Sequence, residues 1–77
     1  MYWNHRVVDM SEENEGEPLF AIREVHYEDN GMPTGHGEPF VMATDIKGLK
    51  RLIAVMKEAL DQPVLTSKDF KGKRNDG

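Results

Sequence analysis

The sequence predicts an α+β fold, a three-stranded antiparallel β-meander with one C-terminal amphipathic helix packed on one face (β-β-β-α). Three observations predict it. Residues 2–10 and 19–28 alternate like strands. Asn30-Gly31 is a strong hairpin signal, because both residues tolerate positive φ. Apolar residues recur at steps of three and four through residues 45–61, which is typical of an amphipathic helix.

The chain has 77 residues, of which 38% are hydrophobic, and no cysteine. A chain of this size buries only about 60% of its unfolded surface, so its stability is marginal. Without cysteine it has neither disulfides nor thiolate metal ligands. We therefore predict one domain over residues 1–65 that depends on one core or on self-association.

The first strand presents Trp3, His5 and Val7 on one face. Residues 11–18, SEENEGEP, interrupt the alternation with four glutamates, a glycine and a proline. This composition predicts a solvated, mobile loop between the first two strands.

Residues 19–28 are the expected central strand. A two-residue turn at Asn30-Gly31 would pair Tyr27 with Thr34, Arg23 with Glu38, Ala21 with Phe40 and Leu19 with Met42. Pro33 and Pro39 lack backbone donors and make the third strand an irregular edge. We expect the helix to cover the apolar stretches 19–22 and 40–43.

The helix is expected to start at an N-cap of Thr44 or Asp45 and to end before Pro63. Residues 66–77, TSKDFKGKRNDG, have one large apolar residue, Phe70. They are predicted to be a disordered basic tail outside the domain.

Charge divides the chain into two parts. Residues 1–45 carry two basic and ten acidic side chains, a net charge of −8, and residues 46–77 carry eight basic and four acidic ones, a net charge of +4. The two halves either attract each other as a solvated surface or present a basic face to an acidic partner.

No arrangement of residues predicts catalysis. Ser11 and Ser67 lie in segments expected to be mobile, where a nucleophile is not positioned. Glu24, His26 and Glu28 alternate on one strand face near His5, which leaves a metal site conceivable, although a solvent-facing strand has the same pattern. We expect no enzymatic activity, no cofactor and no metal.

No run approaches the roughly 18 apolar residues of a membrane span. The start MYWNHRVVDM lacks the basic flank and apolar stretch of a secretory signal. We expect a cytoplasmic protein without membrane contact.

The leading functional hypothesis is a non-catalytic module that binds another protein or forms a homodimer. Amphipathic aromatic residues are enriched at such interfaces. The expected contact residues are Trp3, Tyr27, Lys50, Arg51 and Lys57. The alternative is nucleic-acid binding, or an antitoxin-like regulatory role, through the basic helix and tail. The acidic pI of about 5.2 disfavours that alternative.

Short motifs also carry a resemblance. Trp3 with Arg6-Val7-Val8, Glu24-Val25-x-Tyr27 before Asp29 and Gly31, and the closing Pro63-Val64-Leu65 resemble a group of small uncharacterised bacterial proteins. The likeness covers residues 2–65 and implies a self-contained domain without implying an activity. A looser likeness, in element order alone, is to the antitoxin module of bacterial toxin–antitoxin pairs, whose glycine-rich strands and Pro-Gly-Cys-like segment this chain lacks.

Overall fold

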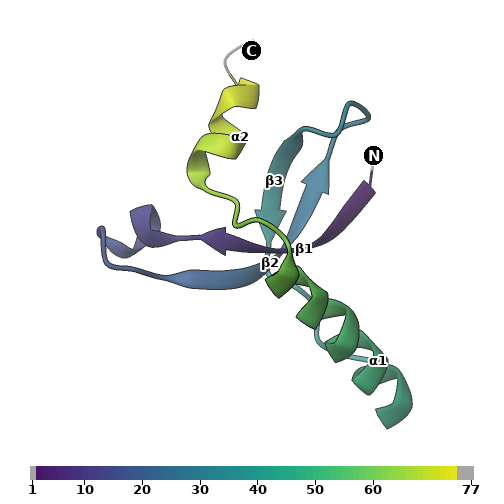
Figure 1. The fold of residues 1–77 in the computed structure, drawn as a ribbon. Coiled ribbons are helices and arrows are strands. Elements are labelled where there is room, and N and C mark those ends of the chain that lie inside the picture. The colour runs from purple at the N-terminus through teal and green to yellow at the C-terminus, as the bar shows by residue number, and fades with distance from the viewer. Residues whose placement is uncertain (1, 75–77) are drawn as a thin grey trace.

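The computed structural model describes residues 2–74, and the side chains of residues 2–70. Three strands, two α-helices and two 3₁₀ turns follow one another along this part of the chain (Figure 1). In order they are β1 (Tyr2–Asp9), η1 (Ser11–Asn14), β2 (Phe20–Tyr27), β3 (Pro33–Gly37), α1 (Ile46–Lys57), η2 (Glu58–Asp61) and α2 (Ser67–Arg74). The predicted β-β-β-α order is confirmed.

The sheet has the order β1-β2-β3, and both pairs are antiparallel. The β1–β2 register runs without interruption from Tyr2 opposite Tyr27 to Asp9 opposite Phe20. Leu65 adds a short parallel bridge beside Val8, on the other edge of β1. Its backbone N donates to the Val7 carbonyl over 2.9 Å, and its carbonyl accepts from Asp9 N over 2.8 Å. The segment after η2 therefore returns to the sheet.

The turn between β2 and β3 differs from the predicted two-residue loop. Glu28 N donates to the Met32 carbonyl over 2.9 Å, so the loop has one more residue than expected. Gly31 takes the left-handed conformation at φ 87°. An irregularity follows, which places Tyr27 opposite Pro33 and returns the register to Glu24 opposite Gly37. The extra loop residue is thus offset by a bulge beside Thr34.

The third strand is shorter than predicted. β3 ends at Gly37, so the expected strand pairs of Glu38, Phe40 and Met42 with β2 do not form. Pro39 has no backbone N–H to donate to the ladder, and the chain leaves the sheet before it. Arg23, expected opposite Glu38, instead donates its Nε to His36 Nδ1 over 3.0 Å.

The acidic connection between β1 and β2 has local order that composition did not predict. Asp9 Oδ1 accepts from the Ser11 backbone N over 3.0 Å and from Ser11 Oγ over 2.6 Å. Ser11 Oγ in turn accepts from Leu19 N over 3.2 Å. These hydrogen bonds lower the pKa of the Asp9 carboxyl, because they favour its charged form. Polar side chains anchor this loop in place of apolar ones.

The core lies on one face of the sheet and includes the C-terminal segment. Val8, Val25, Tyr27 and Phe70 form its buried cluster, and Leu65 packs partly against it. Helix α2 forms over Ser67–Arg74, so the prediction that residues 66–77 are disordered is wrong for this segment. Burial of Phe70 supplies the apolar contact that holds α2, so the folded part extends past residue 65. Residues 75–77 lie outside the described residues.

Helix α1 starts where expected but packs differently. Asp45 is its N-cap, and the side chain accepts from Gly48 N over 2.7 Å. A Cβ at Gly48 would lie 3.1 Å from Asp45 Oδ1 and 3.2 Å from Ala43 Cβ, which explains a glycine early in the helix. Figure 1 shows α1 extending away from the sheet. No residue of Ile46–Lys57 is buried, and Leu19, Phe20, Phe40 and Met42 are exposed. The prediction that this helix covers stretches 19–22 and 40–43 is therefore wrong.

Candidate protein-interaction surface

The apolar half of α1 divides into two strips. At 3.6 residues per turn, Gly48, Leu52 and Val55 lie along one line of the helix. The second strip contains Ile46, Leu49 and Ile53, spaced by three and four residues, and Leu60, which follows seven residues later in η2. The first strip is turned toward β1, and the second is turned away from it.

The outward strip is open to solvent. Ile46 is 68% exposed, and Ile53 and Leu60 are also exposed. Ile46, Leu49, Lys50 and Ile53 line a hollow of about 300 Å³. Lys50 and Lys57 fall along one edge of the strip by helical spacing. We call Ile46, Leu49, Ile53 and Leu60, with Lys50 and Lys57, the α1 surface.

The segment before α1 adds further exposed apolar area. Phe40 is 70% exposed and Met42 69% exposed, and Val41 between them is exposed as well. Because β3 ends at Gly37, these side chains have left the sheet on which they were expected to pack.

The inward strip of α1 faces a second hollow, of about 400 Å³, against β1. Its lining comprises Trp3, Asn4, His5, Gly48, Arg51, Leu52 and Val55. Trp3 meets His5 edge-on, with ring centroids 5.5 Å apart, and His5 is itself buried. The hollow therefore combines an exposed indole, apolar helix side chains and one guanidinium.

The five predicted contact residues do not form one group. Trp3 and Arg51 line the same hollow. Lys50 and Lys57 both lie on the α1 surface and are exposed. Tyr27 does not fit the predicted contact role, because it is buried in the core and stacks on Tyr2 with ring centroids 4.7 Å apart.

Tyr27 has a structural role that depends on its hydroxyl. The hydroxyl donates to Asn4 Oδ1 over 2.7 Å and accepts from Arg6 Nη1 over 3.3 Å. Arg6 Nη2 also donates to the Pro63 carbonyl over 2.6 Å. Tyr27 and Arg6 thus connect the sheet to the chain that returns after η2.

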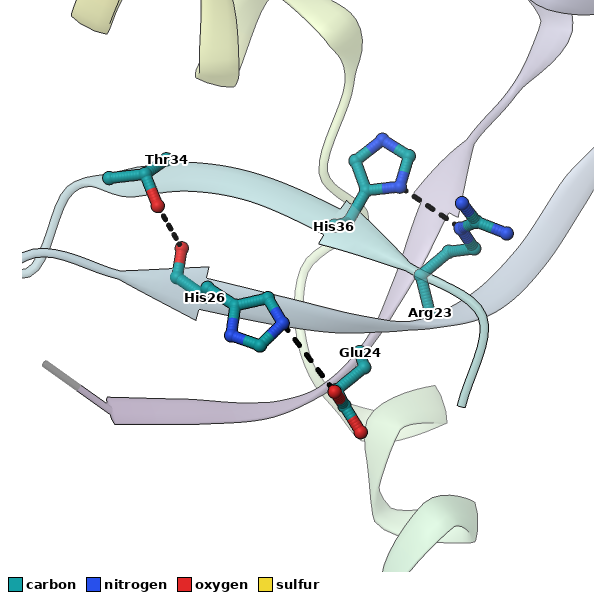
Figure 2. A network of polar contacts seen from close by, with 5 residues as sticks. All are labelled: Arg23, Glu24, His26, Thr34 and His36. Carbon is teal, nitrogen blue, oxygen red and sulfur yellow. Dashed lines mark hydrogen bonds and ion pairs between the residues drawn. The ribbon is translucent and has the colours of Figure 1, made fainter. Parts of the chain in front are cut away.

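Polar side chains of β2 and β3 meet in pairs across and along the strands (Figure 2). His26 Nε2 lies 3.5 Å from Glu24 Oε1, and Thr34 Oγ1 donates to the His26 carbonyl over 3.1 Å. Arg23 of β2 donates a hydrogen bond to His36 of β3, as Figure 2 also shows. Over residues 2–70, no three His, Asp or Glu side chains gather closely enough to hold a metal ion.

His36 connects the sheet to α2. Its ring meets Phe70 at a centroid distance of 4.9 Å and an angle of 62°. Burial lowers the pKa of His36, the Arg23 cation lowers it further, and Glu13 acts in the opposite direction. The neutral imidazole is therefore the form that accepts from Arg23 and supports Phe70.

Comparisons with models of protein families, with curated proteins and with solved structures found no match to this chain. Among the described helices, none is both long enough and apolar enough to cross a membrane. The resemblance to small bacterial proteins remains a prediction.

Sequence reasoning missed the exposed segment at Phe40–Met42 and the outward strip of α1 as candidate contacts. It assigned both to the core, since apolar residues at strand and helix spacing usually pack together. Pro39 was the signal in the sequence that could have indicated this exposed segment. A proline that ends the third strand also removes the apolar residues after it from the sheet.

Proposed function

We propose that this protein is a non-catalytic protein-binding module whose contact surface is centred on α1. One observation carries the proposal: an amphipathic helix presents an apolar strip to solvent, with Ile46 68% exposed. Burying apolar surface is the main driving force of protein association, at about 25 cal/mol per Å² of area removed from water.

The chemistry around the strip supports a protein as the ligand. Lys50 and Lys57 border it, and Phe40 and Met42 lie exposed in the segment that leads into the helix. An apolar centre with a charged rim is the usual anatomy of a protein interface. Trp3 and Arg51, in the hollow between β1 and α1, belong to residue types that often dominate binding energy.

A photo-crosslinking experiment tests the proposal. p-Benzoylphenylalanine is introduced at Ile53, in the middle of the strip, and in a matched chain at Met32, an exposed apolar residue at the β2–β3 turn. After irradiation in the host cell, we expect a discrete covalent adduct from the Ile53 chain that the Met32 chain does not give.

Mass spectrometry of the adduct then identifies the partner. A mass of two chains means a second copy, and another mass means a different protein. An Ile53 chain that yields no adduct, or the same adducts as the Met32 chain, would contradict the proposed function.

Nucleic-acid binding is the second candidate, and the cations of α1 favour it. Lys47, Lys50, Arg51 and Lys57 are all exposed on one helix. Such binding would rest on phosphate contacts, so its affinity would fall steeply with salt. Failure of the protein to retard DNA or RNA at 50 mM salt would end this candidate.

A further inference from the structure

The α1 surface leaves large apolar side chains open to solvent. Ile46 is 68% exposed, Ile53 49% and Leu60 62%. Removing such apolar area from water is the main driving force of protein association. The α1 surface therefore favours a partner that covers it.

The charges beside the α1 surface indicate what kind of surface would cover it. Lys50 and Lys57 border one edge of the α1 strip, so two copies of α1 laid antiparallel would bring lysine against lysine along that edge. Direct pairing of the two helices is disfavoured for this reason. A surface with apolar side chains beside carboxylates fits better.

The same chain carries such a surface at the connection between β1 and β2. Glu13, Glu15 and Glu17 are exposed there, and the exposed Leu19 and Phe20 follow them. Figure 1 places η1 and α1 on opposite sides of the picture. One protomer thus holds the two complementary surfaces well apart.

We propose that a second copy of this chain covers the α1 surface with its own acidic connection, residues 11–20, and that the contact is made twice about a two-fold axis. Leu19 and Phe20 of one copy then pack on Ile46 and Ile53 of the other, and the glutamates face Lys50 and Lys57. Such an exchange closes the assembly at two copies. The inference rests on the proposed function and names its partner.

Charge exchange tests this arrangement. The variants are K50E/K57E, E15K/E17K and the combination of all four, each measured by sedimentation over a range of concentrations. Each double variant should weaken the dimer about tenfold or more, since like charges replace opposite ones at both contacts. The fourfold variant should return to within about threefold of the parent chain, because the opposite charges are restored.

The control is E38K/K68E, which reverses two exposed charges outside residues 11–20 and outside α1 and should leave the dimer unchanged. Far-ultraviolet circular dichroism of every variant separates loss of the dimer from loss of the fold. Raising the salt from 0.1 to 1 M shortens the screening length from about 10 to about 3 Å and should weaken the parent dimer.

Three outcomes overturn the inference: a monomer at 0.5 mM (about 4 mg/ml), a dimer indifferent to both double variants, or a fourfold variant as weak as the doubles. A monomeric chain that still gives an Ile53 adduct of another mass leaves the proposed function standing. Absence of both the dimer and the adduct removes the proposed function as well.

Discussion

The two ends of this molecule use their apolar residues in opposite ways. At the sheet, Val25 is fully buried and Phe70 nearly so, although they come from distant parts of the chain. Along α1, residues with the same chemistry stay in water: Ile46 at the start of the helix and Ile53 at its middle are both exposed. Hydrophobic patterning therefore identifies a face that needs cover, and the topology decides whether the same chain supplies it.

Truncating one phenylalanine in each region should give the largest difference. Phe70→Ala removes a buried ring and should lower the free energy of unfolding by about 3–5 kcal/mol. Phe40→Ala removes an exposed ring and should change it by less than about 0.5 kcal/mol. Urea denaturation of the two variants measures both values. Equal losses would mean that residues 40–42 belong to the core after all.

Tyr27→Phe should have the next largest effect. It keeps the ring in the core and deletes the hydroxyl that bonds Asn4 and Arg6, at a cost of about 1–2 kcal/mol. A double-mutant cycle with Asn4→Ala measures the coupling between the two residues. Strictly additive losses would show that the hydroxyl does not stabilise the fold through Asn4.

Acidification should produce a smaller loss through His36. Its pKa is lowered in the folded protein, so the unfolded chain binds more protons as the pH falls. The stabilisation is fully present above the unfolded pKa, near 6.5, and is lost progressively as the pH falls toward the folded pKa. Urea midpoints at pH 7.5 and 5.5 should differ less in His36→Gln than in the parent chain. An unchanged difference would remove His36 from the pH response.

The smallest effect is expected at Gly48. Helix propensity alone predicts that Gly48→Ala stabilises α1 by about 1 kcal/mol. The added Cβ, however, would crowd the Asp45 cap and Ala43, so we expect a net change within about 0.5 kcal/mol of zero. Thermal melts followed by circular dichroism measure it. A full gain of about 1 kcal/mol would mean that the cap and Ala43 move aside freely.

Much of the fold could be predicted, because its signals are local. Alternation marked β1 and β2, positive φ marked Gly31, and the spacing of apolar residues marked α1. The predicted turn also implies Glu24 opposite Gly37 and His26 opposite Gly35, and both pairs form, although by way of an extra loop residue and a bulge. These features depend on residues that are neighbours in sequence or lie across one turn.

The errors concern contacts between distant segments. Nothing local distinguishes Phe70 in a basic stretch from a residue of a disordered tail, because its burial depends on Val8, Val25 and Tyr27 being assembled beside it. For the same reason Tyr27 was expected at an interface, although the returning chain covers it. The candidate surface was missed because the helix was expected to cover stretches 19–22 and 40–43, whereas Leu19, Phe20, Phe40 and Met42 remain exposed.

The bridge between Val8 and Leu65 has a consequence for how the protein folds. These residues lie far apart in the sequence, and the core is complete only when Phe70 packs against Val8, Val25 and Tyr27. Contacts of such long sequence separation form late and slowly. A partly folded chain therefore keeps Val25 and Tyr27 accessible, and exposed apolar surface of this kind makes such a species prone to aggregation.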